Sequence, residues 1–401
     1  MTEPNETVEA DGGETERHAT NLELFLDLVF VFAVGQIVGL LARDLTPAGF
    51  GRGLLLAWLV WWLWSQFAWM GTAVDLGKGS VSQVLVLLAI PVTLLMAISI
   101  PEAYGASGLQ FAGAYAVVNL LCLAIQGHAA WSDPAARTAW LEYIPLAAIA
   151  PVLLLVGSFF SGDVRTSIWV LVALVNIASA LAGGRTGGED GNSWRIDPTH
   201  FAERHALFVI IVLGEVMVAI GVAASTAAQG FDVIIGLGVL AAAAVACAFW
   251  WSYFAFIPQA VEHALRVTAE GDRGRVARNL FTYWHFPVVF GILLYALVAK
   301  HVVIDPAHHL GAPDLIVLAL GVALFAGGLE VVKWFAAHQV GPERPIAIVV
   351  VAILCAAAGP ALPGAVLLVL VAAVLIVMQS VSLRRFAAAK RSVAGTASDP
   401  V

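Results

Sequence analysis

Charged residues are unusually scarce in this sequence, and their scarcity excludes a water-soluble globular protein. Of the 401 residues, 12% are Asp, Glu, Lys or Arg and 60% are hydrophobic. An ordinary soluble domain is roughly a quarter charged. A chain of this length could bury a large core, but too few charged side chains remain to coat its surface. The apolar surface must therefore face lipid, and the composition predicts an integral membrane protein.

Cysteines, basic clusters and short catalytic motifs are also few or missing. The three cysteines lie inside apolar runs without CxxC spacing, which excludes a disulfide framework. No basic stripe of the kind that binds nucleic acid is present. Neither a nucleophile elbow nor a phosphate-binding loop occurs, and His200 with Glu203 makes only an isolated ligand-like pair. We therefore expect no enzymatic activity, no metal, no cofactor and no nucleic-acid partner.

Long hydrophobic runs, by contrast, are abundant. A bilayer core about 30 Å thick requires roughly 20 apolar residues for each helical crossing. The runs that qualify lie near residues 22–41, 50–73, 81–100, 108–130, 138–158, 164–183, 200–222, 231–257, 278–300, 314–337, 345–361 and 363–383. The pattern predicts an all-α, polytopic bundle of about twelve transmembrane helices. Only a tight Gly-Pro break, within residues 359–364, separates the last two.

The positions of the basic residues predict an orientation. If the N-terminus is cytoplasmic and twelve helices cross the membrane, fifteen Lys or Arg residues lie in cytoplasmic segments and four on the opposite side, with Arg204 inside a helix. This is a strong positive-inside bias. It places the chain in the inner (plasma) membrane with both termini in the cytoplasm, and it supports an even number of helices.

Short similarities between the two halves predict two six-helix repeats. WSQFA at residues 64–68 resembles WSYFA at residues 251–255, and GQI at residues 35–37 resembles GEV at residues 214–216. Six helices per copy would give both copies the same orientation. Chance similarity between segments rich in Trp and Phe is the alternative. We expect an acidic disordered tail (1–20), a first repeat (21–183), a cytoplasmic linker (184–199), a second repeat (200–385) and a cytoplasmic C-terminal tail (386–401).

The first predicted helix contains two acids near its start. Glu23 and Asp27 are four residues apart, so both project from one face, about 6 Å apart along the axis. An ionised carboxylate in lipid costs at least about 2.5–3.5 kcal/mol, so Asp27 should face the bundle interior. An acid that complements the positive end of the helix dipole is the alternative for Glu23, whereas Asp27 lies too deep for a simple cap.

The seventh predicted helix has a polar stripe. At 100° per residue, His200, Arg204 and Glu215 fall at about 0°, 40° and 60° on the helical wheel. Arg204 and Glu215 are about 16 Å apart along the axis, so each needs a partner from another helix or water. Glu203 lies next to this stripe in the sequence. Glu215 is the deepest predicted charge, and a protonated structural acid that is hydrogen-bonded across helices is the alternative reading.

Further polar residues, including Gln36 and His285, lie inside the predicted helices. Glu330 and Lys333 are spaced to pair on one helix face, which favours a structural salt bridge. In the assumed topology, most of the ionisable residues in the helices lie in the cytoplasmic half. This distribution predicts a polar vestibule that opens to the cytoplasm and narrows towards Glu215.

Three segments together resemble a known family. They are ELFLDLVFVFA at residues 23–33, ERH at residues 203–205 with GE at 214–215, and YWHFP at residues 283–287. The combination resembles the bacterial low-temperature-requirement A (LtrA) family over roughly residues 20–385. The resemblance implies a link to growth in the cold and no settled molecular activity. The motif positions that it implies are Glu23, Asp27, Glu203, Arg204, Glu215 and His285.

A second similarity concerns the first helix alone. FLDLVF at residues 25–30 is similar to the Phe-Ser-Asp motif of a potassium-channel family that is also built from six-helix repeats. Here Leu26 replaces the serine, and Ala206 stands where the repeat alignment would place a second aspartate. These departures put the interaction network of that channel family in doubt for this chain.

The leading functional hypothesis is a secondary transporter. Carboxylates near the midplane of a repeat interface suit coupled ion binding, so Asp27 and Glu215 would bind and release a proton or cation, with Arg204 as the counter-charge or anion contact. A cation channel and a membrane-embedded enzyme or lipid-handling protein are the alternatives. Expected partners are membrane lipids and an unidentified small solute or ion, and homo-oligomer formation stays open. The expected solute- or ion-binding residues are Glu23, Asp27, Gln36, Glu203, Arg204, Glu215 and His285.

Overall fold

The computed structural model describes residues 17–74, 76, 80–183, 196–227 and 230–396, and all regular elements among them are helices. The first half contains α1 (Asn21–Arg43), α2 (Pro47–Ala73), α3 (Val81–Ser99), η1 (Ile100–Glu102), α4 (Gly108–Ala130), α5 (Pro134–Ser158) and α6 (Gly162–Gly183). The second half contains α7 (Pro198–Ser225), α8 (Val233–Phe254), α9 (Ile257–Val267), α10 (Glu270–Ala277), η2 (Arg278–Tyr283), α11 (His285–Ile304), α12 (Ala312–Ala337), α13 (Glu343–Ile353), η3 (Leu354–Ala358), η4 (Gly359–Ala361) and α14 (Gly364–Thr396).

Twelve candidate membrane spans occur in the described part of the chain, which confirms the all-α transmembrane prediction. The last two are separate helical segments, Glu343–Ala361 and Gly364–Ala388, so the tight break predicted between them is confirmed. Large apolar side chains such as Leu95, Leu240 and Val377 are exposed on the outside of the bundle. A lipid environment explains this surface, because such side chains in water would lose the stabilisation that burial gives.

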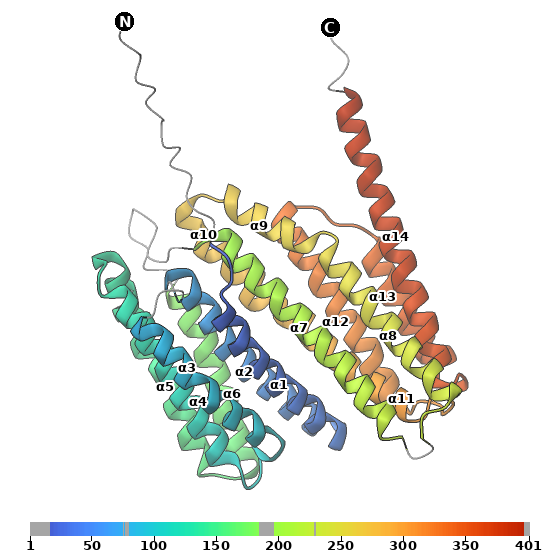
Figure 1. Cartoon of the computed structure of the whole chain (residues 1–401), viewed down its shortest axis with the longest axis horizontal. Helices are drawn as coiled ribbons and strands as arrows, with labels where there is room; N and C mark the ends of the chain where they lie inside the picture. Colours follow the sequence, from blue (N-terminus) through green and yellow to red (C-terminus); the bar gives the residue numbers. More distant parts are fainter. Residues whose placement is uncertain (1–16, 75, 77–79, 184–195, 228–229, 397–401) are drawn as a thin grey trace, which may run out of the picture.

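The helices form two groups that follow the chain order. Figure 1 shows α1–α6 gathered on one side and α7–α14 on the other. The groups meet where α1 and α2 contact α7 and α11. This arrangement sets the two predicted repeats next to each other, while the relation between the repeats stays a prediction.

The ends of the predicted regions differ in detail from the helices. Residues 1–16 of the acidic tail and residues 184–195 of the linker lie outside the described residues. Residues 17–20 precede α1 and contact the end of α2 and the start of α7. At the other end, α14 continues beyond residue 385 to Thr396.

Helix α11 follows a π-helical turn, η2. The third residue of α11 is Pro287, which lacks an N–H and whose ring clashes with the carbonyl group four residues earlier. A π turn at this place widens the helix and changes which carbonyls have intrahelical partners. Side chains bond two of them: His285 Nδ1 lies 2.7 Å from the Leu280 oxygen, and Trp61 Nε1 donates to the Thr282 oxygen at 2.7 Å. The turn is therefore fixed against α2.

Candidate functional site: a buried charge cluster

The starts of α1 and α7 are capped by their own side chains. The Thr20 hydroxyl accepts from the Glu23 N–H, and the Glu23 carboxylate accepts from the Thr20 N–H at 2.8 Å, which is a capping box. Asp197 caps α7 by accepting from the His200 N–H at 3.0 Å. The caps fix the first turns of both helices, so Glu23 and His200 enter the bundle from defined positions.

A buried ion pair joins these two helices. Arg204 Nη2 on α7 donates to Asp27 Oδ1 on α1 at 2.9 Å, and both side chains are 0% exposed. Trp64 Nε1 on α2 donates to the same carboxylate oxygen at 2.8 Å. Asp27 lies six residues after the start of α1, and therefore about 9 Å along the helix axis. The expectation that Asp27 faces the bundle interior and that Arg204 finds its partner on another helix agrees with this geometry.

A second buried pair lies one helical turn nearer the helix starts. His200 Nε2 on α7 lies 3.1 Å from Glu23 Oε1 on α1, and Arg204 Nε lies 3.8 Å from the same oxygen. Gly71 on α2 packs directly against this pair. A Cβ at position 71 would overlap Glu23 Oε1 and lie 2.9 Å from His200 Cε1. The absence of a side chain at Gly71 therefore makes room for the contact between α1 and α7.

Several atoms of this cluster have no hydrogen-bond partner among the residues that the structure describes. They are Asp27 Oδ2, His200 Nδ1, and Nε and Nη1 of Arg204, all of them buried. Arg204 thus uses one good hydrogen bond to Asp27 and a longer electrostatic contact to Glu23, although a guanidinium has five donors. A buried polar atom without a partner costs roughly 1–3 kcal/mol, and more when the group is charged. The cluster therefore retains bonding capacity for a proton, a cation or a polar group.

A chain of rings continues from the charge cluster towards α8 and α11. The His205 ring on α7 lies 4.9 Å from the Trp64 ring and 5.4 Å from the His285 ring on α11. His285 Nδ1 contacts the Leu280 carbonyl oxygen, which can only accept, so Nδ1 carries the proton. The neutral ring then accepts at Nε2 from the Tyr253 hydroxyl, 3.1 Å away. His285 is fully buried and belongs to this aromatic contact rather than to the ion pairs.

The remaining predicted residues lie outside the cluster. Glu203 is 35% exposed and accepts from the Ala19 N–H at 2.9 Å, beside the His18 ring. Glu215 is half-buried farther along α7, where a Cβ on Gly35 of α1 would lie 2.6 Å from its Oε1. Gln36 follows Gly35 and is partly buried. Of the predicted set, the structure therefore brings together Glu23, Asp27 and Arg204.

The charges form a closed cluster, which differs from the open vestibule that the distribution of ionisable residues suggested. The side chains of Glu23, Asp27 and Arg204 are at most 3% exposed. Helical spacing placed these residues at one end of the bundle, but spacing cannot show that oppositely charged groups from two helices neutralise each other. Mutual neutralisation lowers the cost of burial and allows the helices to close around the charges.

Sequence reasoning missed the parts played by Trp64 and Gly71. The sequence places Trp64 only in a repeat motif, yet its Nε1 donates to Asp27 Oδ1 at 2.8 Å. A usable signal was available, because a buried indole N–H usually finds an acceptor, and Asp27 is one of few acids in the predicted helices. No comparable signal pointed to Gly71, since its function depends on a contact between three helices.

Comparison with known proteins agrees with the motifs of the first and seventh helices. The family described as Bacterial low temperature requirement A protein (LtrA) matches residues 18–380. The uncharacterized protein RA0937 of Rhizobium meliloti (strain 1021) is 28% identical over 281 residues, which are 69% of this chain and 67% of that protein. No solved structure matches. The match covers eleven candidate spans and most of the twelfth, and it includes every member of the charge cluster, so this chain belongs to the LtrA family.

Proposed function

We propose that this protein is a secondary transporter in which Asp27 binds and releases a proton or cation. The observation that carries the proposal is the fully buried, incompletely bonded pair of Asp27 and Arg204, which joins the first helix of one half to the first helix of the other. Ionisable groups that are buried between membrane helices are costly and are usually functional. Glu215 is the second acid in the proposal, as a half-buried carboxylate farther along the same interface.

A proton or cation would compete with Arg204 for the Asp27 carboxylate, and this competition would couple ion binding to a change of conformation. A proton or a small cation on Asp27 would remove the partner of Arg204, and breaking one side of a buried ion pair costs about 3–5 kcal/mol. Arg204 must then find another acceptor, and Glu23 Oε1 is already 3.8 Å from its Nε. A ligand shifts a conformational equilibrium only through its different affinity for the two states. Ion binding would thus favour a state in which α7 is displaced relative to α1.

In the conformation described, the Asp27–Arg204 pair is shielded from water on both sides of the membrane. Neither Asp27 nor Arg204 is exposed, so exchange with water requires α1 and α7 to separate. The two halves touch mainly through α1 and α2 against α7 and α11. Transporters built from two similar halves typically work by such rocking around a fixed site.

Flux measurements in proteoliposomes test the proposal. We expect the purified protein to move protons or a monovalent cation, read by a lumenal pH dye under imposed proton, sodium and potassium gradients. Asp27→Asn should abolish this flux, because the amide cannot exchange a proton or hold a cation charge. Glu215→Gln should lower it.

The matched control is Glu102→Gln. Glu102 is an exposed acid in a 3.4 Å surface pair with Arg43, so this change should leave the flux as in the native chain. Native-like flux in both Asp27→Asn and Glu215→Gln would overturn the proposal. Current that rises with the gradient without saturating would assign the protein to the cation-channel alternative.

We also infer that the protein lies in the bacterial plasma membrane with both ends in the cytoplasm. The fifteen-to-four distribution of Lys and Arg supports this orientation, and the start of α1 and the end of α14 lie at the same end of the bundle (Figure 1). A reporter enzyme that is active only in the cytoplasm, fused after residue 401, should be active. An inactive fusion in a folded protein would reverse the orientation.

A further inference from the structure

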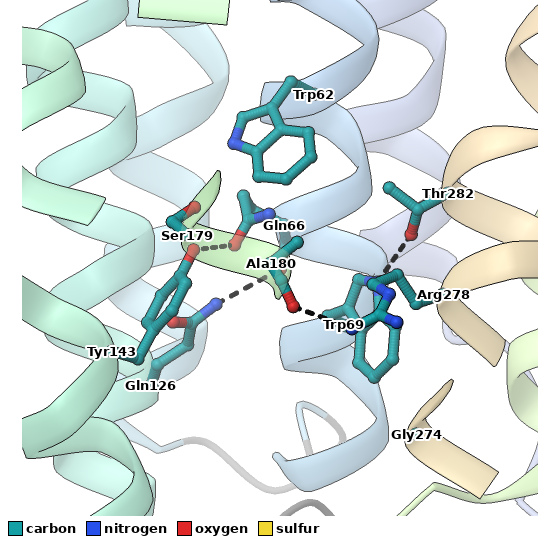
Figure 2. Close-up of a pocket in the computed structure, with 10 residues that line it drawn as sticks. All are labelled: Trp62, Gln66, Trp69, Gln126, Tyr143, Ser179, Ala180, Gly274, Arg278 and Thr282. Atoms are coloured by element: carbon teal, nitrogen blue, oxygen red, sulfur yellow. Dashed lines mark hydrogen bonds between the residues drawn. The ribbon is translucent and has the colours of Figure 1, made fainter. Parts of the chain in front are cut away.

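A cavity lies on the far side of α2 from the ion pair. Its volume is about 90 Å³, and residues from α2, α4, α5, α6, α10 and η2 line it (Figure 2). At roughly 10–15 Å³ per water by this kind of measure, it holds several waters or one small solute. The cavity is therefore formed by both halves of the molecule, because α10 and η2 belong to the second half.

One wall of the cavity is a fixed group of amides and hydroxyls. The Tyr143 hydroxyl donates to Gln66 Oε1 at 2.6 Å, and Gln126 Nε2 donates to the Gln66 carbonyl oxygen at 3.4 Å. Figure 2 shows this group on one side of the space, with Trp69 and Arg278 on the other. Trp69 is itself held by its Nε1, which donates to Thr282 Oγ1 at 2.9 Å. The cavity thus combines flat apolar indole surface with a few positioned polar groups, as ligand sites do.

Two polar atoms of the lining residues have no hydrogen-bond partner within the described part of the chain, and neither has surface open to the cavity. Gln126 is 5% exposed, and its Oε1 is buried without a donor. Arg278 Nε is likewise buried without an acceptor. Arg278 Nη1 donates to the Ala180 carbonyl oxygen at 2.9 Å, and no carboxylate in the described part of the chain pairs with this guanidinium. Arg278 therefore brings to the cavity wall a guanidinium that lacks a negatively charged acceptor.

We propose that this cavity binds a small organic anion of the aromatic carboxylate class. A carboxylate would accept from Arg278, and a flat ring would lie against Trp62 and Trp69. Charge-assisted bonds between guanidinium and carboxylate groups are among the stronger hydrogen bonds in proteins. This inference depends on the proposed transport function and extends it, because the anion would be the transported solute.

Helix α2 connects this cavity to the ion pair. Trp64 bonds Asp27, whereas Gln66, two residues later, lines the cavity. Side chains two positions apart point to nearly opposite faces of a helix. Trp61 of the same helix bonds the Thr282 carbonyl oxygen of η2, next to the cavity. Movement of α2 would therefore change the ion pair and the anion site together, which is what coupled transport needs.

Calorimetric titration of the full chain in lipid nanodiscs tests the anion site directly. The probe is 4-hydroxybenzoate, and its neutral analogue is 4-hydroxybenzamide. We expect the acid to bind at least about tenfold more tightly than the amide, because only the acid gains a charge-assisted bond. Arg278→Gln should weaken binding of the acid by at least about tenfold and leave binding of the amide nearly unchanged.

The matched control is Arg275→Gln. Arg275 is an exposed arginine that pairs with Asp272 at 3.0 Å on the same cytoplasmic segment, so this change should not alter binding. Thermal unfolding of each variant shows that it is folded before titration.

Three results would overturn the anion site. They are no binding of 4-hydroxybenzoate to the native chain, equal binding of acid and amide, and native-like binding in folded Arg278→Gln. The binding experiment and the flux experiment test the anion site and the transport proposal separately. Binding without ion flux would retain the site and reject transport, whereas Asp27-dependent flux without binding would retain transport and reject the site.

Discussion

The molecule buries carboxylates with arginine in two regions, and the two differ in how completely they are bonded. On α12, Glu330 Oε1 accepts from the Gly341 N–H at 2.6 Å and Oε2 accepts from Arg344 Nη1 at 2.8 Å. Lys333 lies 3.7 Å from Oε1. Every partner belongs to α12, α13 or the loop between them. On α1, one oxygen of Asp27 has two donors and the other has none.

The difference distinguishes a buried carboxylate with partners on both oxygens from one with partners on a single oxygen. The Glu330 group closes a helical hairpin within one half, and both of its oxygens are bonded. The Asp27 group joins helices from both halves and leaves four buried atoms without a partner among the described residues, whereas in the Glu330 group only Arg344 Nε lacks one. A partly bonded buried network is unfavourable for stability, which is consistent with the proposed exchange of partners at Asp27. Three substitutions sharpen or break this contrast.

The largest effect is expected for Arg204→Met. It leaves Asp27 buried without a counter-charge and Glu23 with only its His200 contact, so the free energy of unfolding should fall by about 3–5 kcal/mol. Thermal and denaturant unfolding in detergent measures the loss. The double variant Asp27→Asn/Arg204→Met should lose clearly less than the sum of the two single variants, because it removes both charges of one pair. Additive losses would show that Asp27 and Arg204 do not interact energetically.

A smaller effect is expected for Glu330→Gln. Arg344 would lose a charge-assisted bond, so stability should fall by about 1.5–3 kcal/mol. Ion flux per folded molecule should stay native-like, because the hydrogen bonds and ion pairs of Glu330 within the described residues lie in α12, α13 and their connection. The measurement pairs unfolding with the proteoliposome assay. Loss of flux at normal folding would remove the distinction between the two charge groups.

The smallest effect on stability is expected for Gly71→Ala. The new methyl group would displace the flexible end of the Glu23 side chain, at a cost of roughly 1 kcal/mol. Flux should nevertheless fall, since the Glu23–His200 contact would shift. Gly51→Ala on the same helix is the control, because a Cβ there meets nothing within 4 Å. Equal behaviour of the two alanine variants would mean that the close approach at Gly71 has no function.

Much of the fold could be predicted from the sequence, because span number depends on local composition. The twelve runs of apolar residues correspond to the twelve candidate spans. The energetic cost of a charge in lipid also predicted that Asp27 faces inward. Its partner could not be identified, because Asp27 and Arg204 are 177 residues apart and no periodicity links them.

For Glu330 and Glu215, spacing along the helix predicted only part of the environment of the side chain. The pairing of Glu330 with Lys333 was predicted from their separation on one helix, and the 3.7 Å contact confirms it. The shorter bond comes from Arg344 on the next helix, which spacing on α12 could not predict. Glu215 was predicted as the deepest charge, yet it is half-buried, and its Oε1 lies against Gly35 of α1, a tertiary contact that spacing could not predict.

The segment before α1 fastens one end of the contact between the two halves. Arg17 donates to the carbonyl oxygens of Thr72 and Val74 at 2.9 and 2.7 Å, and its own N–H lies 3.4 Å from Asp197. With this end clamped, jaw-like opening of the molecule would start at the opposite ends of α1 and α7. Spin labels at positions 43 and 225 should then report larger distance changes than labels near residues 21 and 198, and equal changes at both ends would rule out such a hinge.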